Sequence, residues 1–207
     1  MPKTIITALL TLALTCGCLK QVGQPDNNTL PDSVQTIVVL PVVAAAETDR
    51  DGASPKVAKE IQTGIEEFSQ ILSDYFQGNP KVQLLSPEEV DSHATSYNAS
   101  RSAQALAIAK SLKAEAVMLW GLQRYHQRGG GDYAVQSPAS VAFDYRLIHT
   151  ASGQTLCAGT FDETQQSVSD NLLSLRSLAN RGFKWIPAVD LAREGVAKKI
   201  PECRYLQ

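Results

Sequence analysis

The sequence has 207 residues, of which 43% are hydrophobic and 19% are charged, and its formal net charge is −2. This composition is typical of one ordinary globular domain with appendages. A nucleic-acid-binding protein needs concentrated positive charge to displace counterions from phosphates, so the net negative charge argues against that class of function.

The amino terminus has the pattern of an export signal. Lys3 supplies a positive charge, and residues 5–15 form an unbroken run of Ile, Thr, Ala and Leu. Such a run has the right length for the apolar part of a signal peptide, but a transmembrane helix needs about 20 apolar residues. We assign residues 1–17 to a signal peptide; the alternative is a buried amino-terminal helix.

The apolar run ends in a segment, residues 14–18 (LTCGC), that resembles the bacterial lipobox. In that motif small residues precede a cysteine that receives fatty acyl chains such as palmitate and becomes the new amino terminus. Cys18 follows Gly17, as the motif prefers, whereas Cys16 follows Thr15 and fits less well. The resemblance therefore predicts that Cys18 is lipidated and that the protein contacts the membrane through this anchor.

Residues 18–35 are predicted to tether the lipid to a folded domain. They contain Pro25, Pro31 and several Asn, Asp and Gln residues, with neither helical nor strand periodicity. Removing the leader leaves 18 Lys and Arg against 21 Asp and Glu, a net charge of −3. Leu19, directly after the modified cysteine, implies sorting to the periplasmic face of the outer membrane; the inner membrane is the alternative.

A single globular domain is predicted over residues 36–207, beginning with alternating strands and helices. The first strand is rich in Ile and Val, as in strands buried on both faces, and Ser54 and Pro55 are typical of a helix start. Ser86 and Glu89 match a capping box at the start of another helical turn. The expected elements are strands over 37–43 and 82–85 and helices over 54–77, from 86, and over 102–112.

The second half of the domain has the alternating pattern of antiparallel strands. Strands are expected over 116–125, 141–148 and 155–161, with turns at 129–132 and 151–153, and helices over 171–178 and 186–200. The order predicts an α/β fold: a mixed parallel and antiparallel sheet of about five strands with helices packed on it.

Three short motifs in this order are similar to those of a family of bacterial envelope proteins. They are Leu40-Pro41 at the end of the first strand, residues 114–121 (AEAVMLWG), and residues 147–156 (LIHTASGQTL). The family includes the amino-terminal domain of the Tol translocation protein B, the curli-secretion channel lipoprotein and the lipoprotein activators of penicillin-binding proteins.

The resemblance implies a non-enzymatic accessory or adaptor protein that binds another envelope protein, or another copy of this chain. The alternative is a subunit of an oligomeric envelope secretion or transport apparatus. An enzyme is a third class, but no catalytic pattern supports it, and we expect no cofactor. The same fold hosts several functions, so the motifs alone do not name the partner.

The residues that could carry chemistry favour structural interpretations. His93, His126 and His149 are scattered without metal-ligand spacing, so no metal is expected. Residues 47–52 resemble half of a calcium loop, but the distal Glu is missing and a solvated turn is favoured. The glycines at 129–131 join two expected strands, whereas a phosphate-binding loop joins a strand to a helix.

Cys157 and Cys203 are the two cysteines clear of the leader. An exported protein meets an oxidising compartment, so a disulfide between them is expected. The alternative is one buried and one exposed free thiol.

Residues 167–187 form a long connection before the last helix, and long connections tend to carry function. Arginine and aromatic side chains are the types that anchor protein interfaces. In the alternative, its leucines form a helix on the sheet and its aromatic residues cap the core. The expected partner-binding residues are Arg176, Arg181, Phe183, Lys184 and Trp185.

Overall fold

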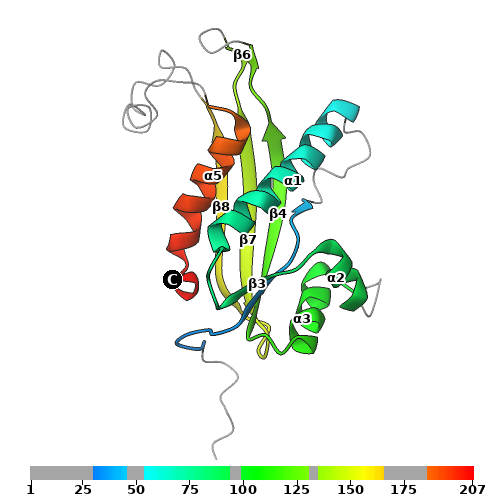
Figure 1. The fold of residues 1–207 in the computed structure, drawn as a ribbon, viewed down its shortest axis with the longest axis vertical. Coiled ribbons are helices and arrows are strands. Elements are labelled where there is room, and N and C mark those ends of the chain that lie inside the picture. Colours follow the sequence, from blue (N-terminus) through cyan, green and yellow to red (C-terminus); the bar gives the residue numbers. More distant parts are fainter. Residues whose placement is uncertain (1–29, 46–53, 94–98, 131–134, 166–185) are drawn as a thin grey trace, which may run out of the picture.

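The fold is built on one mixed sheet, as expected from the sequence (Figure 1). The computed structural model describes residues 30–45, 54–93, 99–130, 135–165 and 186–207. Within these residues the sheet has six strands, in the order β3-β1-β4-β7-β8, and β2 also pairs with β4. Their bounds are β1 Ile37–Val39, β2 Val43–Ala44, β3 Val82–Leu84, β4 Ala116–His126, β7 Ser140–His149 and β8 Thr155–Thr164.

β4 pairs with parallel strands along one side and with an antiparallel strand along the other. β1 runs parallel to β3 and β4, with Ile37 opposite Val82 and Ala116. β7 runs antiparallel to β4 and to β8, and a bulge interrupts the β4–β7 register between Leu122 and Arg124. The expected first strand is divided at Pro41, which lacks a backbone N–H, into β1 and β2.

Two helices cover one face of the sheet. They are α1, Pro55–Phe76, and α5, Ala188–Lys199 (Figure 1). Ser54 caps α1 by accepting a hydrogen bond from the Val57 N–H at 3.4 Å, which confirms the expected helix start. Phe68 of α1 packs against Trp120 and Phe143, with ring centroids 5.4 and 4.8 Å away. The larger of two apolar cores lies between these helices and the sheet.

The opposite face carries a smaller core under α2, Pro87–His93, and α3, Arg101–Ser111. The expected capping box begins α2: the Ser86 N–H donates to the Glu89 carboxylate at 2.7 Å, and the Glu89 N–H donates to the Ser86 hydroxyl at 3.3 Å. Val117 and Leu119 of β4 face this core together with Ile108 of α3. β4 is therefore buried on both sides.

The structure differs from the sequence expectations at three further places. Gly129–Gly130 forms a short strand, β5, that pairs with β6, Val135–Ser137, where a plain turn was expected. β8 continues to Thr164. Val34 is only 1% exposed, so packed residues begin upstream of residue 36.

The close approach of α5 to the sheet gives a test of the packing. A Cβ at Gly195 would lie 2.8 Å from ring atoms of both Phe143 and Phe161. We expect Gly195→Ala to lower the free energy of unfolding by about 1–3 kcal/mol, because the helix or the rings must move. Denaturant unfolding measures the change.

The control is Ala197→Gly on the exposed side of the same helix. It should cost about 1 kcal/mol through helix propensity alone. A stabilising effect of Gly195→Ala, as expected for an unhindered helical glycine, would contradict the packing described here.

Candidate functional site

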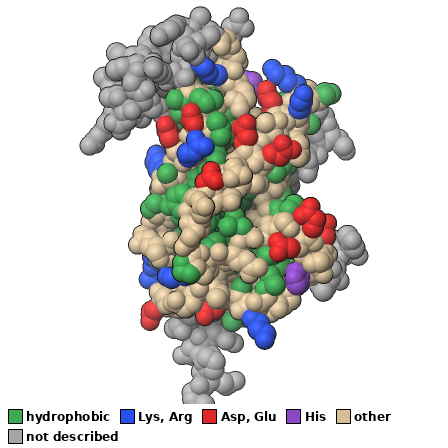
Figure 2. Space-filling model, in the orientation of Figure 1, with side chains coloured by type: hydrophobic (Ala, Val, Ile, Leu, Met, Phe, Trp, Pro, Cys, Tyr) green, Lys and Arg blue, Asp and Glu red, His purple; other side chains and the backbone are tan. Residues whose placement is uncertain are grey.

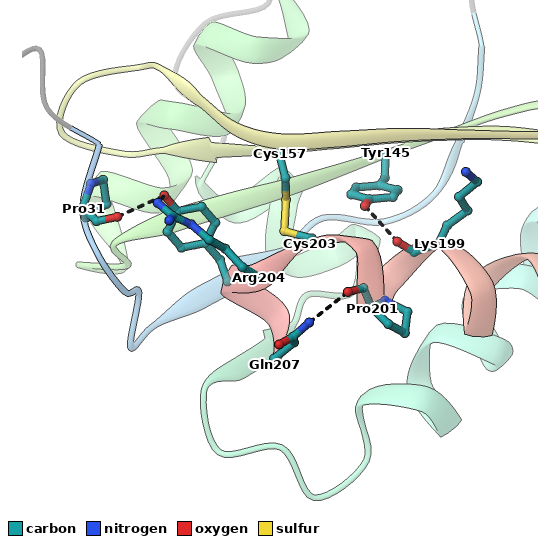
Figure 3. The surroundings of a disulfide bond; sticks show 9 residues. Pro31, Tyr145, Cys157, Lys199, Pro201, Cys203, Arg204 and Gln207 are labelled. Atoms are coloured by element: carbon teal, nitrogen blue, oxygen red, sulfur yellow. Dashed lines mark hydrogen bonds between the residues drawn. A yellow bond between two sulfur atoms is a disulfide. The ribbon is translucent and has the colours of Figure 1, made fainter.

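The amino-terminal segment joins the domain at one end of the sheet, which we call the tether end. There the Tyr205 hydroxyl donates to the Pro31 carbonyl at 3.0 Å (Figure 3). The Gln35 N–H donates to the Glu115 carboxylate at 2.7 Å. Tyr205 is only 4% exposed. The last residues of the chain thus fix the place where the amino-terminal segment meets the domain.

A disulfide attaches the carboxy-terminal tail to β8 near the same end. Cys157 and Cys203 are bonded, with their Cα atoms 5.8 Å apart, across 46 positions of sequence (Figure 3). The Tyr145 hydroxyl donates to the Lys199 carbonyl at 3.0 Å beside this bond. Burial, with a smaller contribution from Glu202, raises the pKa of Tyr145. The sequence left two alternatives for Cys157 and Cys203, a disulfide or two free thiols. The structure has the disulfide.

The opposite end of the sheet, the distal end, lies where β8 finishes. In the amide orientation that satisfies both of its polar groups, the Gln165 side chain donates to the Ile186 carbonyl and accepts from the Ile186 N–H, each at 3.1 Å. Gln165 is 6% exposed, and its own N–H donates to the Ala139 carbonyl at 2.9 Å. Gln165 and Ile186, far apart in the sequence, therefore meet at one point of the sheet.

Most residues singled out from the sequence lie outside the described residues. These are Cys18, the half calcium loop at 47–52, and the five expected partner-binding residues Arg176, Arg181, Phe183, Lys184 and Trp185. Of the segment that holds the five expected partner-binding residues, the structure describes only the flanking residues. These are Gln165 and Ile186, which are hydrogen-bonded to each other at the distal end. No sequence pattern predicts this contact, because an isolated Gln has no distinctive spacing.

Ionisable groups gather between α1 and β4 towards the distal end. The Tyr125 hydroxyl donates to the Glu67 carboxylate, and His126 contacts the Glu60 carboxylate at 3.0 Å. Burial and the hydrogen bond with Glu67 raise the pKa of Tyr125. These groups satisfy one another, so their geometry serves to hold α1 on the sheet.

A cavity of about 360 Å³ opens between α2, α3 and the segment from β1 to β2. One guanidinium nitrogen of Arg101 donates to the Trp120 carbonyl at 2.6 Å. Burial lowers the pKa of Arg101, and the nearby Asp144 opposes that shift. The cavity can hold an apolar side chain beside a positive charge. Its lining is Leu40, Pro41, Val43, Pro87, Val90, Asp91, Arg101, Gln104, Ala105 and Ile108.

The histidines make local contacts with neighbouring side chains. His93 contacts the Ser111 hydroxyl at 3.3 Å, and His149 contacts the Ser152 hydroxyl at 2.9 Å. Within the described ranges, no group of three or more His, Cys, Asp or Glu residues is arranged to hold a metal ion. The same residues contain no helix with the length and apolarity needed to cross a membrane.

Charges of both signs are interspersed on the face that carries α1 and α5. Figure 2 shows Lys and Arg side chains between Asp and Glu, with hydrophobic groups among them. Where this face is described, it shows no large basic patch of the kind that nucleic-acid binding requires.

The geometry defines a class of protein: an α/β domain with a mixed sheet, whose carboxy-terminal tail is bonded to β8 at one end and whose Gln165 and Ile186 meet at the other. No protein-family model matches the sequence, and no curated protein matches it. The chain is similar in fold to solved structures of low sequence identity.

The similar structures include those of PelC, LpoB and TolB. The PelC dodecamer from Paraburkholderia phytofirmans is 13% identical, with a TM-score of 0.44 over 84% of this chain and 90% of that one. The LpoB C-terminal domain from Escherichia coli is 14% identical, with a TM-score of 0.38 over 64% and 85%. TolB from Acinetobacter baumannii is 10% identical, with a TM-score of 0.33 over 73% and 29%. TolB is among the proteins that the sequence motifs resembled.

The disulfide can be tested by thiol counting and by removal. We expect Cys157 and Cys203 to contribute no titratable thiol in the denatured, unreduced protein. Replacing both by Ser should lower the free energy of unfolding by about 2–4 kcal/mol, because the unfolded chain regains the entropy of a closed loop.

Tyr205→Phe tests the other contact that holds the tether end together, which is made by the Tyr205 hydroxyl. It removes two hydrogen bonds of the Tyr205 hydroxyl, one donated to Pro31 and one accepted from Arg204, and should cost about 1–3 kcal/mol. Two free thiols per chain in the unmodified protein would contradict the bond.

Proposed function

We propose that this chain is a lipid-anchored periplasmic accessory protein that binds another envelope protein without catalysing a reaction. The leader and Cys18 supply export and anchoring, and residues 18–29 tether the folded domain to the outer membrane. The distal end presents the segment 166–185 to the partner. The structural tie of that segment, Gln165 on Ile186, is the observation that carries the proposal.

The two ends of the domain support this arrangement. Ile37 of β1 lies beside Ala116, which pairs with His149 at the end of β7, so the tether enters at the turn between β7 and β8. Thr164 ends the ten-residue strand β8, which begins at Thr155, at the other end. A strand of that length spans about 30 Å, so Gln165 and Ile186, which flank the segment, lie about that far from the tether end.

The compartment is supported by the disulfide. Cys157 and Cys203 are joined at the tether end, and structural disulfides persist in oxidising compartments such as the periplasm. The lipobox-like residues 14–18 favour attachment by acyl chains, and two such chains make an anchor stable. A subunit of an oligomeric secretion or transport apparatus is the second candidate, favoured only by the motif resemblance.

The anchor is tested at the two leader cysteines. Cys18→Ala should abolish incorporation of radiolabelled palmitate and stall processing, whereas Cys16→Ala should leave both unchanged. Density fractionation should place the mature protein in the outer membrane, because Leu19 follows the modified cysteine. Lipidation that survives Cys18→Ala but not Cys16→Ala would move the site to Cys16.

Partner binding is tested on the segment itself. Replacing Arg181 and Lys184 by Ala should reduce partner recovery after cross-linking in membranes by at least about tenfold, equivalent to about 1.4 kcal/mol. The melting temperature should remain nearly unchanged. The control is Arg146→Ala with Lys198→Ala, the same charge change on exposed parts of β7 and α5. Equal recovery from both double variants would place the docking surface elsewhere.

A further inference from the structure

The two edges of the sheet differ in their protection against pairing with another strand. β3, at one edge, has three residues and is preceded by Pro80 and Lys81. β8, at the other, has ten residues and contains neither Pro nor Lys. Within the described residues no strand pairs with its outer side. Proteins usually protect an edge by shortness, proline or lysine, so β8 is an open template for strand addition.

The register identifies which backbone groups of β8 face outwards. The Gln165 N–H donates to the Ala139 carbonyl, and the pairs from Ser140–Thr164 to Leu147–Cys157 continue without interruption. Hydrogen-bonded pairs alternate along an antiparallel ladder, so the odd-numbered residues from 157 to 163 bond to β7. The N–H and C=O groups of Ala158, Thr160 and Asp162 therefore point away from the sheet.

Neither face obstructs this edge. Gly195 lies against both Phe143 and Phe161, so α5 sits above β7 and β8 rather than outside β8. If a second copy continued the sheet, the two α5 helices would be separated by two strand spacings, about 9.5 Å. Packed helices need about 8–10 Å, so both fit. On the other face Ala158 and Thr160 are exposed.

We propose that β8 pairs antiparallel with β8 of a second copy, centred on Thr160, to form a two-fold dimer with one continuous sheet. This centre sets Thr160 opposite itself, Asp162 opposite Ala158 and Glu163 opposite Cys157. Like charges opposite each other destabilise a sheet, and here both acids face uncharged residues. The strand is thus complementary to itself, and the contact is closed because one surface serves both copies.

This contact goes beyond the accessory role, because it requires no foreign partner. The occupant is a second copy rather than another protein's strand because the charge pattern of β8 fits its own sequence in antiparallel register. The oligomeric state can be measured independently of partner recovery. A monomeric chain would overturn the proposed self-pairing and leave the accessory role unchanged.

The first test removes one outward N–H. Thr160→Pro blocks the centre of the contact but leaves the ladder with β7 intact, and the preceding Gly159 tolerates a following proline. The full chain, purified from membranes in detergent, should be a dimer by light scattering, and Thr160→Pro should be a monomer with a similar melting temperature. Thr160→Val, which keeps the N–H, should remain a dimer.

The second test locates the two-fold axis. Cys157 and Cys203 are already bonded to each other, so a new thiol in the mature chain reacts alone. Thr160→Cys should form a covalent dimer on mild oxidation, because its two copies face each other within disulfide reach. Thr164→Cys, on the same face, should not, because its copies would lie about 27 Å apart.

A monomeric wild-type chain overturns the proposal. So does a dimer that survives Thr160→Pro, or one in which Thr160→Cys and Thr164→Cys cross-link equally, because each requires a contact elsewhere.

Discussion

Burial of β4 on both faces is the constraint on which the rest of the structure depends. Its residues from Ala116 to Leu122 are all buried. Trp120 faces the core under α1 and α5, whereas Val117 faces the core under α3. β1 and β2 bond to one side of the strand and β7 to the other. Both layers of helices and both directions of pairing therefore depend on a single strand.

This central strand also separates the two ends of the domain. A parallel β1 and an antiparallel β7 place the amino-terminal segment and the β7–β8 turn at the tether end. β8 then carries the chain back to the distal end, where Gln165 closes the next segment. The disulfide and the Tyr205 hydrogen bond to Pro31 hold the tether end together. The sheet thus separates the point where the amino-terminal segment meets the domain from the point where Gln165 meets Ile186.

The polar groups of the described residues serve mainly to join elements. Glu67 and Tyr125 connect α1 to β4, and Arg124 and Asp162 connect β4 to β8. The proposed functions accordingly use surfaces: a segment at the distal end and the backbone groups along β8. They are compatible with each other, because the pairing edge runs along the side of the domain and leaves both ends available.

The sequence by itself determined the elements whose signals are local. The Ser54 cap, the capping box at Ser86, and the alternation along β7 arise from residues a few positions apart, and they are present as expected. Gly129 and Gly130 carry no side-chain pattern, so their short strand was not predicted. The tertiary structure alone decided the contacts between distant residues: Tyr205 reaches Pro31 across 174 positions, and Gln165 meets Ile186. Sheet register and helix packing choose those partners, and no local pattern encodes them.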